Sequence, residues 1–166
     1  MNPRVKSVLV LVAFLAIAFA VAGLGSLATI QNVEGWYADA EKAPWSPPNW
    51  LFGPVWTLLY TAMAVAAWLI WRRRDETEVR RPLTLYVVQL MLNAIWTPVF
   101  FGLYPFIGPL ALWIALVIIV ALDVLVLLTV LAFWRVSRAA AWLLAPYLAW
   151  LLFATTLNAA VAVLNS

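Results

Sequence analysis

Five long apolar stretches dominate this sequence and most strongly limit what the chain can fold into. They span approximately residues 7–31, 50–71, 82–103, 109–134 and 140–164. Each is long enough to cross the hydrocarbon core of a bilayer as a helix, which takes roughly 20 residues. The stretches are apolar on all sides, whereas the strands of a membrane barrel alternate in polarity over about ten residues. The sequence therefore predicts an all-α membrane protein, a single domain over residues 1–166 that forms a bundle of five transmembrane helices.

The composition agrees with this class and excludes several others. Of the 166 residues, 67% are hydrophobic and 10% are charged, whereas a soluble domain is about half apolar and a quarter charged. The chain has no cysteine and no histidine, which excludes disulfides, thiolate nucleophiles and histidine-ligated haem. We therefore expect no metal site and no cofactor. The charges that give a net +3 are clustered, and they indicate topology and not nucleic acid binding.

Basic residues lie almost entirely on one side of the predicted bundle. If the chain crosses five times, the N-terminus and the second and fourth connections share a side, and the other side has only Lys42. The basic residues of the first side are Arg4, Lys6, Arg72, Arg73, Arg74, Arg80, Arg81, Arg135 and Arg138. The positive-inside rule then places the N-terminus in the cytoplasm and the C-terminus outside. This bias suits a bacterial inner membrane and favours five spans over four or six.

The first apolar stretch allows another interpretation. The segment "MNPRVKSVLVLVAFLAIAFAVAG" has a basic start, an apolar centre and small residues near Ala20 and Ala22, as a signal peptide has. Cleavage there would leave four helices. The apolar run continues past Gly25, and the charge distribution is consistent with a retained first helix, so we expect five.

Aromatic and polar side chains form one-sided stripes on three predicted helices. The stripes consist of Phe52, Trp56 and Tyr60 in the second helix, of Gln89, Asn93, Trp96 and Phe100 in the third, and of Tyr147, Trp150, Ala154 and Leu157 in the fifth. Trp113 lies one turn into the fourth helix, toward the same side of the membrane. These spacings each place the side chains on one helix face. Tryptophans of an interfacial belt lie at helix ends, and these lie deeper. The pattern fits either a ligand pocket with flat apolar walls or a packed core.

The connection between the first two spans is rigid and aromatic. Its prolines favour extended or turn conformations, and Trp45 is able to pack downward as a plug. We interpret this connection as a lid over the outer mouth of the bundle. Its expected lid residues are Trp36, Tyr37, Pro44, Trp45, Pro47 and Pro48.

Three segments resemble the translocator protein family, also called the tryptophan-rich sensory protein or peripheral-type benzodiazepine receptor family. They are "WYADAEKAPWSPPNWLFGPVWTLLY", "QLMLNAIWTPVFFG" and "APYLAWLLFATTLN". The resemblance covers the first connection and the second, third and fifth helices. It implies a five-helix bundle, usually a homodimer, with a pocket beneath the first connection. The ligands it implies are porphyrins and haem, sterols and other lipids, and synthetic isoquinoline and benzodiazepine-type drugs.

The resemblance also implies particular ligand contacts. Matched position by position, they are Phe52, Gly53, Val55, Trp56, Trp96, Trp150, Ala154 and Leu157. Four more residues complete the candidate ligand-binding set. The stripes contribute Tyr60, Gln89 and Asn93, and Trp113 is included because of its depth in the fourth helix. The polar members of the set, Gln89 and Asn93, would supply hydrogen bonds to the ligand.

The chain departs from the family pattern in two places. It ends "LNAAVAVLNS", without the tyrosine and basic residue of the cholesterol motif proposed for animal members, so sterol binding is doubtful. Asp123 lies near the middle of the fourth helix, where a carboxylate is costly and by default functional. A protonated side chain bonded to a neighbouring helix or to a dimer partner is the alternative.

Three functions compete at this point. The first is a receptor or sensor that binds a tetrapyrrole by stacking on Trp56, Trp96 and Trp150. The second is a light-dependent enzyme that degrades porphyrin, with Trp56 and Trp150 as electron or hydrogen donors. The third is a transporter of porphyrins or lipids, against which stand the lack of internal repeats and of a charged pathway. No acid–base pair or nucleophile supports ordinary catalysis, so we favour the receptor.

Overall fold

The computed structural model describes residues 2–166, and within them it contains helices and short connections without any strand. Five helical segments are long and apolar enough to cross a membrane. They are α1 (Pro3–Val33), α3 (Asn49–Trp71), α4 (Arg80–Thr97) continued by the π-helical turn η1 (Pro98–Gly102), α6 (Pro109–Trp134) and α7 (Arg138–Leu164). The prediction of an all-α, five-helix membrane protein is confirmed.

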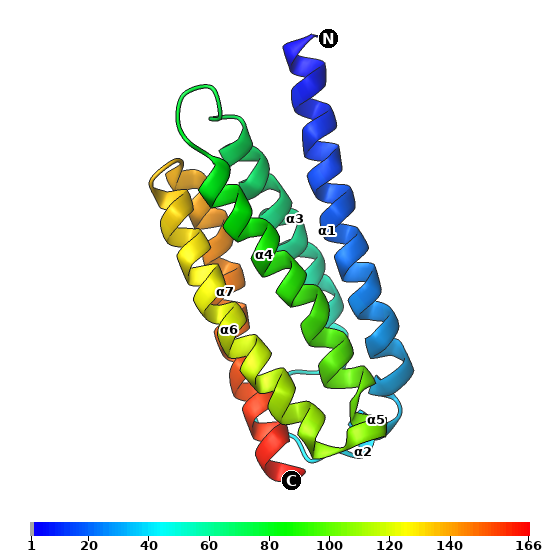
Figure 1. Ribbon diagram of the computed structural model, residues 1–166. Helices are drawn as coiled ribbons and strands as arrows, with labels where there is room; N and C mark the ends of the chain where they lie inside the picture. Colours follow the sequence, from blue (N-terminus) through cyan, green and yellow to red (C-terminus); the bar gives the residue numbers. More distant parts are fainter. Residues whose placement is uncertain (1) are drawn as a thin grey trace.

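The five spans run alternately up and down, so the two termini lie at opposite ends of the bundle (Figure 1). One end carries the N-terminus and the connections α3–α4 and α6–α7, and we call it the arginine-rich end. The other end carries the C-terminus and the short helices α2 (Trp36–Asp39) and α5 (Tyr104–Ile107), which lie side by side there. We call it the lid end, and the lid segment is residues 34–48.

The helices differ in how closely they pack. α3, α4, α6 and α7 form the main bundle, and α1 leans away from it toward its N-terminus (Figure 1). Ala18 is the only fully buried residue described in α1. In α3, by contrast, Ala64, Ala66 and Ala67 are completely buried, because small side chains let membrane helices approach closely. Most side chains of α1 are therefore not enclosed by the rest of the bundle.

Proline and glycine set the helix breaks at the lid end. Pro98 has no N–H for the carbonyl of Ala94, and the chain widens there into η1, where the N–H of Leu103 donates to the carbonyl of Pro98 at 3.1 Å. Gly108 then reverses the chain with a φ of 60° before α6 begins, a conformation that costs glycine little. These two breaks place Phe100 and Phe101 beneath the lid segment.

Candidate functional site

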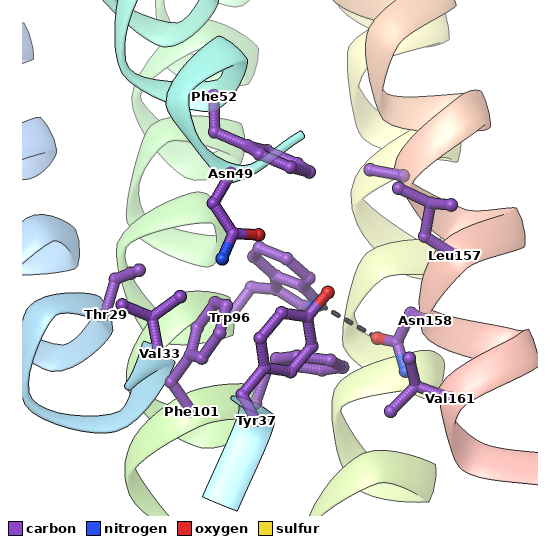
Figure 2. Close-up of a pocket in the computed structure, with 12 residues that line it drawn as sticks. Thr29, Val33, Tyr37, Asn49, Phe52, Trp96, Phe101, Leu157, Asn158 and Val161 are labelled. Atoms are coloured by element: carbon purple, nitrogen blue, oxygen red, sulfur yellow. Dashed lines mark hydrogen bonds between the residues drawn. The ribbon is translucent and has the colours of Figure 1, made fainter. Parts of the chain in front are cut away.

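A cavity of about 90 Å³ lies beneath the lid segment, between α1, α3, η1 and α7. Its lining is mostly apolar and aromatic. The residues are Thr29, Val33, Tyr37, Asn49, Phe52, Trp96, Phe100, Phe101, Ala154, Leu157, Asn158 and Val161 (Figure 2). The lining comes from every transmembrane segment except α6, so the bundle as a whole positions it.

The aromatic walls are held by ring packing. Trp96 stacks on Phe100 with ring centroids 5.4 Å apart and planes 25° apart. The ring of Tyr37 meets Phe101 edge-on at 5.2 Å. Such pairs contribute about 0.5–1.5 kcal/mol beyond their buried area. They fix flat apolar surfaces around the cavity, which suits a flat ligand.

Polar groups at the cavity fall into two kinds. The indole Nε1 of Trp96 donates to Oδ1 of Asn158 at 3.1 Å, and Nδ2 of Asn158 donates to the carbonyl of Leu112 at 3.1 Å. These groups are already paired. Figure 2 shows the Tyr37 hydroxyl and the Asn49 amide pointing into the cavity, and within residues 2–166 neither side chain forms a hydrogen bond to protein. A ligand would find its hydrogen-bonding partners there.

Tyr37 keeps its proton over the whole physiological range. Burial raises the pKa of its hydroxyl above the ordinary value of 10.0, because the phenolate would be poorly solvated. Lys42 lies over the ring, with Nζ 4.8 Å from the ring centroid. The hydroxyl is therefore a neutral donor and acceptor, and Lys42 is the only basic side chain at this end of the bundle.

The lid segment is fastened to the bundle at three points. The indole Nε1 of Trp36 donates to the carbonyl of Phe101 at 2.9 Å. The side chain of Asn165 bonds both backbone groups of Glu41, each at 2.9 Å. Trp45 donates to the hydroxyl of Thr156 at 3.4 Å. Trp45 does not plug the bundle, because it is 54% exposed and bonds Thr156 of α7, while Tyr37 is the lid residue that lines the cavity.

A second hollow of about 360 Å³ adjoins the cavity. It runs between α1 and α3 and shares Thr29, Val33, Asn49 and Phe52 with the cavity. Its α1 side is lined by Ala22, Gly25 and Ser26 together with larger residues. We call it the α1–α3 groove. Ligand pockets usually measure roughly 300–1,000 Å³, so the cavity alone is too small for a drug-sized ligand, and the groove is large enough.

The structure brings together only part of the candidate set predicted from the sequence. Tyr37, Phe52, Trp96, Ala154 and Leu157 line the cavity. Gly53, Trp56 and Tyr60 line the α1–α3 groove. The remaining candidates line neither hollow, and they are Val55, Gln89, Asn93, Trp113 and Trp150, together with the lid residues Trp36, Pro44, Trp45, Pro47 and Pro48.

Gln89 and Asn93 lie in a polar cluster inside the bundle instead. The hydroxyl of Tyr60 donates to Oδ1 of Asn93 at 2.5 Å, and Nδ2 of Asn93 donates to the hydroxyl of Tyr147 at 2.9 Å. That hydroxyl in turn donates to Oε1 of Gln89 at 3.1 Å. The amides are thus bonded to protein, as polar groups inside a membrane bundle must be.

Trp113 and Trp150 have other partners than the cavity. Trp113 is 42% exposed at the edge of α6 and donates to the hydroxyl of the C-terminal Ser166 at 3.0 Å. Trp150 packs edge-on against Phe52, with ring centroids 5.8 Å apart. Its buried Nε1 has no hydrogen-bond partner among residues 2–166. Trp150 thus supports a wall of the cavity from behind.

Sequence reasoning missed several lining residues. Thr29 and Val33 belong to α1, where they are ordinary residues of a membrane span and carry no distinguishing pattern. Asn158 had a detectable pattern, because it lies one helical turn after Ala154 and next to Leu157. Asn49 reaches the lining from the first residue of α3, and Phe101 reaches it from the widened turn η1.

Comparisons with known proteins agree with this architecture. The chain is 44% identical over 161 residues to a tryptophan-rich protein TspO of Archaeoglobus fulgidus, covering 97% of each chain. It is 44% identical over 125 residues to the translocator protein of Homo sapiens, covering 74% of this chain and 70% of that protein. It is 34% identical over 145 residues to a tryptophan-rich sensory protein of Cereibacter sphaeroides, covering 87% and 84%. Because the TspO/MBR family model also matches residues 13–164, which include most of α1 and all of the other four spans, the chain belongs to the TspO/MBR family.

Proposed function

We propose that the protein is a membrane receptor or sensor that binds tetrapyrroles, such as porphyrin or haem, or similar flat hydrophobic ligands including benzodiazepine-type drugs. The observation that carries the proposal is the cavity beneath the lid segment, with aromatic walls and with two polar side chains, Tyr37 and Asn49, that have no protein partner within residues 2–166. The sensory and translocator names of relatives support a role of this kind.

In the proposed mechanism, the bound ligand extends from the cavity into the α1–α3 groove. A flat ring is larger than the cavity, so part of it occupies the groove between Trp56 and the small residues of α1. The Tyr37 hydroxyl and the Asn49 amide bind polar atoms of the ligand. Lys42 is the group at this end that pairs with a ligand carboxylate. We also place the N-terminus in the cytoplasm and expect a homodimer.

The test is a titration of the purified protein with protoporphyrin IX in the dark, followed by porphyrin fluorescence. We expect saturable binding, and we expect Trp96→Phe to raise the Kd by up to about fivefold, since the smaller ring loses part of an aromatic contact that contributes about 1 kcal/mol. The matched control is Trp142→Phe, which changes a tryptophan that is 65% exposed at the arginine-rich end.

Two outcomes would contradict the proposal. Equal Kd values for Trp96→Phe and Trp142→Phe would place the porphyrin elsewhere on the protein. Bleaching of bound porphyrin under light that depends on the protein, and that is lost in Trp56→Phe, would favour the degrading enzyme over the sensor.

A further inference from the structure

We propose that the arginine-rich end carries a binding site for one anionic phospholipid, between α4 and α6. A hollow of about 340 Å³ lies there, at the far end of the bundle from the cavity beneath the lid segment. Its charged lining residues are Glu78, Arg81 and Arg135, and its apolar lining includes Leu85, Leu128, Leu131 and Ala132. The inference does not depend on the ligand of the lid-end cavity.

The two arginines of this hollow are available to an outside anion. Arg81 and Arg135 are exposed, and within residues 2–166 neither forms an ion pair, a side-chain hydrogen bond or a cation–π contact. Of the other arginines at this end, Arg4 and Arg80 lie outside the lining of the hollow, and the remaining four are already engaged. Arg73 pairs with Glu76, Arg74 pairs with Asp75 and lies over Trp71, and Arg72 and Arg138 lie over Trp68 and Trp134.

The hollow continues from the arginines along an apolar path into the membrane. On α4, Leu85 lies one turn beyond Arg81, which is about 6 Å deeper at 1.5 Å per residue. On α6, Leu131 and Leu128 lie about 6 and 10 Å deeper than Arg135. Leu128 and Leu131 are 44% and 53% exposed, so they face the lipid side of the bundle. The arginines therefore suit the charged head group of a lipid, and the leucines deeper in the membrane suit its acyl chain.

One acidic side chain also lies in the lining of the hollow. Glu78 is the only acidic residue of the hollow, and its Oε1 accepts the backbone N–H of Arg80 at 2.5 Å, at the start of α4. It opposes part of the attraction of the two arginines for a phosphate. A second basic crevice, between α1 and α3 at the same end, has no leucine in its lining and therefore lacks the path for an acyl chain.

Two guanidinium groups are suited to bind a phosphate monoanion, whether it is free or part of a lipid. The apolar path beside them favours a phosphate that belongs to a lipid. Basic pockets between transmembrane helices are a known way to bind anionic head groups. Each basic residue near an anionic surface contributes about fivefold in affinity. Removing both arginines should therefore weaken binding by roughly 30-fold.

The experiment measures the apparent Kd of dioleoylphosphatidylglycerol for the full-length protein in detergent micelles by native mass spectrometry. We expect one tight site, at least tenfold weaker binding of dioleoylphosphatidylcholine, and roughly 30-fold weaker binding in Arg81→Gln/Arg135→Gln. The charge-matched control is Arg73→Gln/Arg138→Gln, which should stay within twofold. Glu78→Gln should bind more tightly than the wild type.

A second variant tests the apolar path without changing any charge. Ala132→Phe fills the hollow beneath the arginines and should abolish the tight site while circular dichroism and the Tm show a folded protein. Inorganic phosphate, added at the same concentration as the lipid, should not displace it. Displacement by phosphate, equal binding of both lipids, an equal loss in the control double variant, or unchanged binding in Ala132→Phe would each overturn the proposal.

Discussion

At the scale of single residues, Asn165 is the side chain that fastens the lid segment most directly. Its amide bonds both the N–H and the carbonyl of Glu41, at 2.9 Å each. Asn165→Ala removes both bonds, and a hydrogen bond of this kind contributes about 0.5–1.5 kcal/mol. We expect the association rate of protoporphyrin IX to rise about threefold to tenfold, measured by stopped-flow fluorescence.

The neighbouring residue provides the control for this prediction. Ser166→Ala removes a hydroxyl that bonds Trp113 and the carbonyl of Ala162, outside the lid segment. Its association rate should equal that of the wild type. If both variants speed association equally, the C-terminus acts by loosening the end of α7 and not by holding the lid.

A second prediction at this scale concerns the polar cluster. Tyr147→Phe removes the hydroxyl that accepts from Asn93 and donates to Gln89. The Nδ2 of Asn93 and the Oε1 of Gln89, which belong to buried side chains, then lose this hydrogen bond. We expect a loss of about 1–2 kcal/mol in the free energy of unfolding, seen as a lower Tm. Tyr104→Phe is the matched control, because that hydroxyl has no protein partner within residues 2–166, and a similar loss there would contradict the explanation.

At the scale of elements, the turn η1 shapes the cavity. Without the N–H of residue 98, the chain widens after Pro98 and turns Phe100 and Phe101 toward the lid segment. Pro98→Ala restores the N–H and favours a regular α-helix, which rotates the later residues by about 100° for each residue gained. We expect the Kd for protoporphyrin IX to rise at least fivefold in a dark titration.

The matched control for this element is Pro146→Ala. Pro146 also lies inside a transmembrane helix, α7, but it is exposed and outside the cavity lining. Its Kd should match the wild type. A Kd unchanged in Pro98→Ala as well would mean that the wide turn is set by the packing around it and not by the missing N–H.

The element scale also shows what the sequence was able to predict. Length and hydropathy identify the membrane spans, because a bilayer demands long helices whatever their neighbours are. The rotation of each helix is harder to read, since residues such as Leu and Val suit lipid and protein contacts equally. Trp113 was assigned to the site by its depth alone, and in the structure its indole bonds the C-terminal Ser166 and does not line the cavity. Trp96 was assigned by a polar and aromatic stripe, and it does line the cavity.

At the scale of the whole molecule, what the sequence left open is how separate elements meet. The lining contributed by Thr29 and Val33 depends on where α1 crosses the bundle, and no local pattern encodes that crossing. Gln89 and Asn93 were predicted to face a ligand because amides inside a membrane need partners. They found those partners in Tyr60 and Tyr147, since tyrosines of two other helices lie within reach.

The last prediction concerns the orientation of the whole bundle in its membrane. The connection from α3 to α4 and the N-terminus lie at the arginine-rich end, while Ser166 lies at the lid end (Figure 1). Because the chain has no cysteine, single cysteines report each end without background. In intact cells, an impermeant maleimide should label Ser166→Cys and should label Asn2→Cys and Glu76→Cys only after lysis, as the positive-inside rule requires. The reverse pattern would place the arginine-rich end outside, and labelling of all three in intact cells would mean that both orientations coexist.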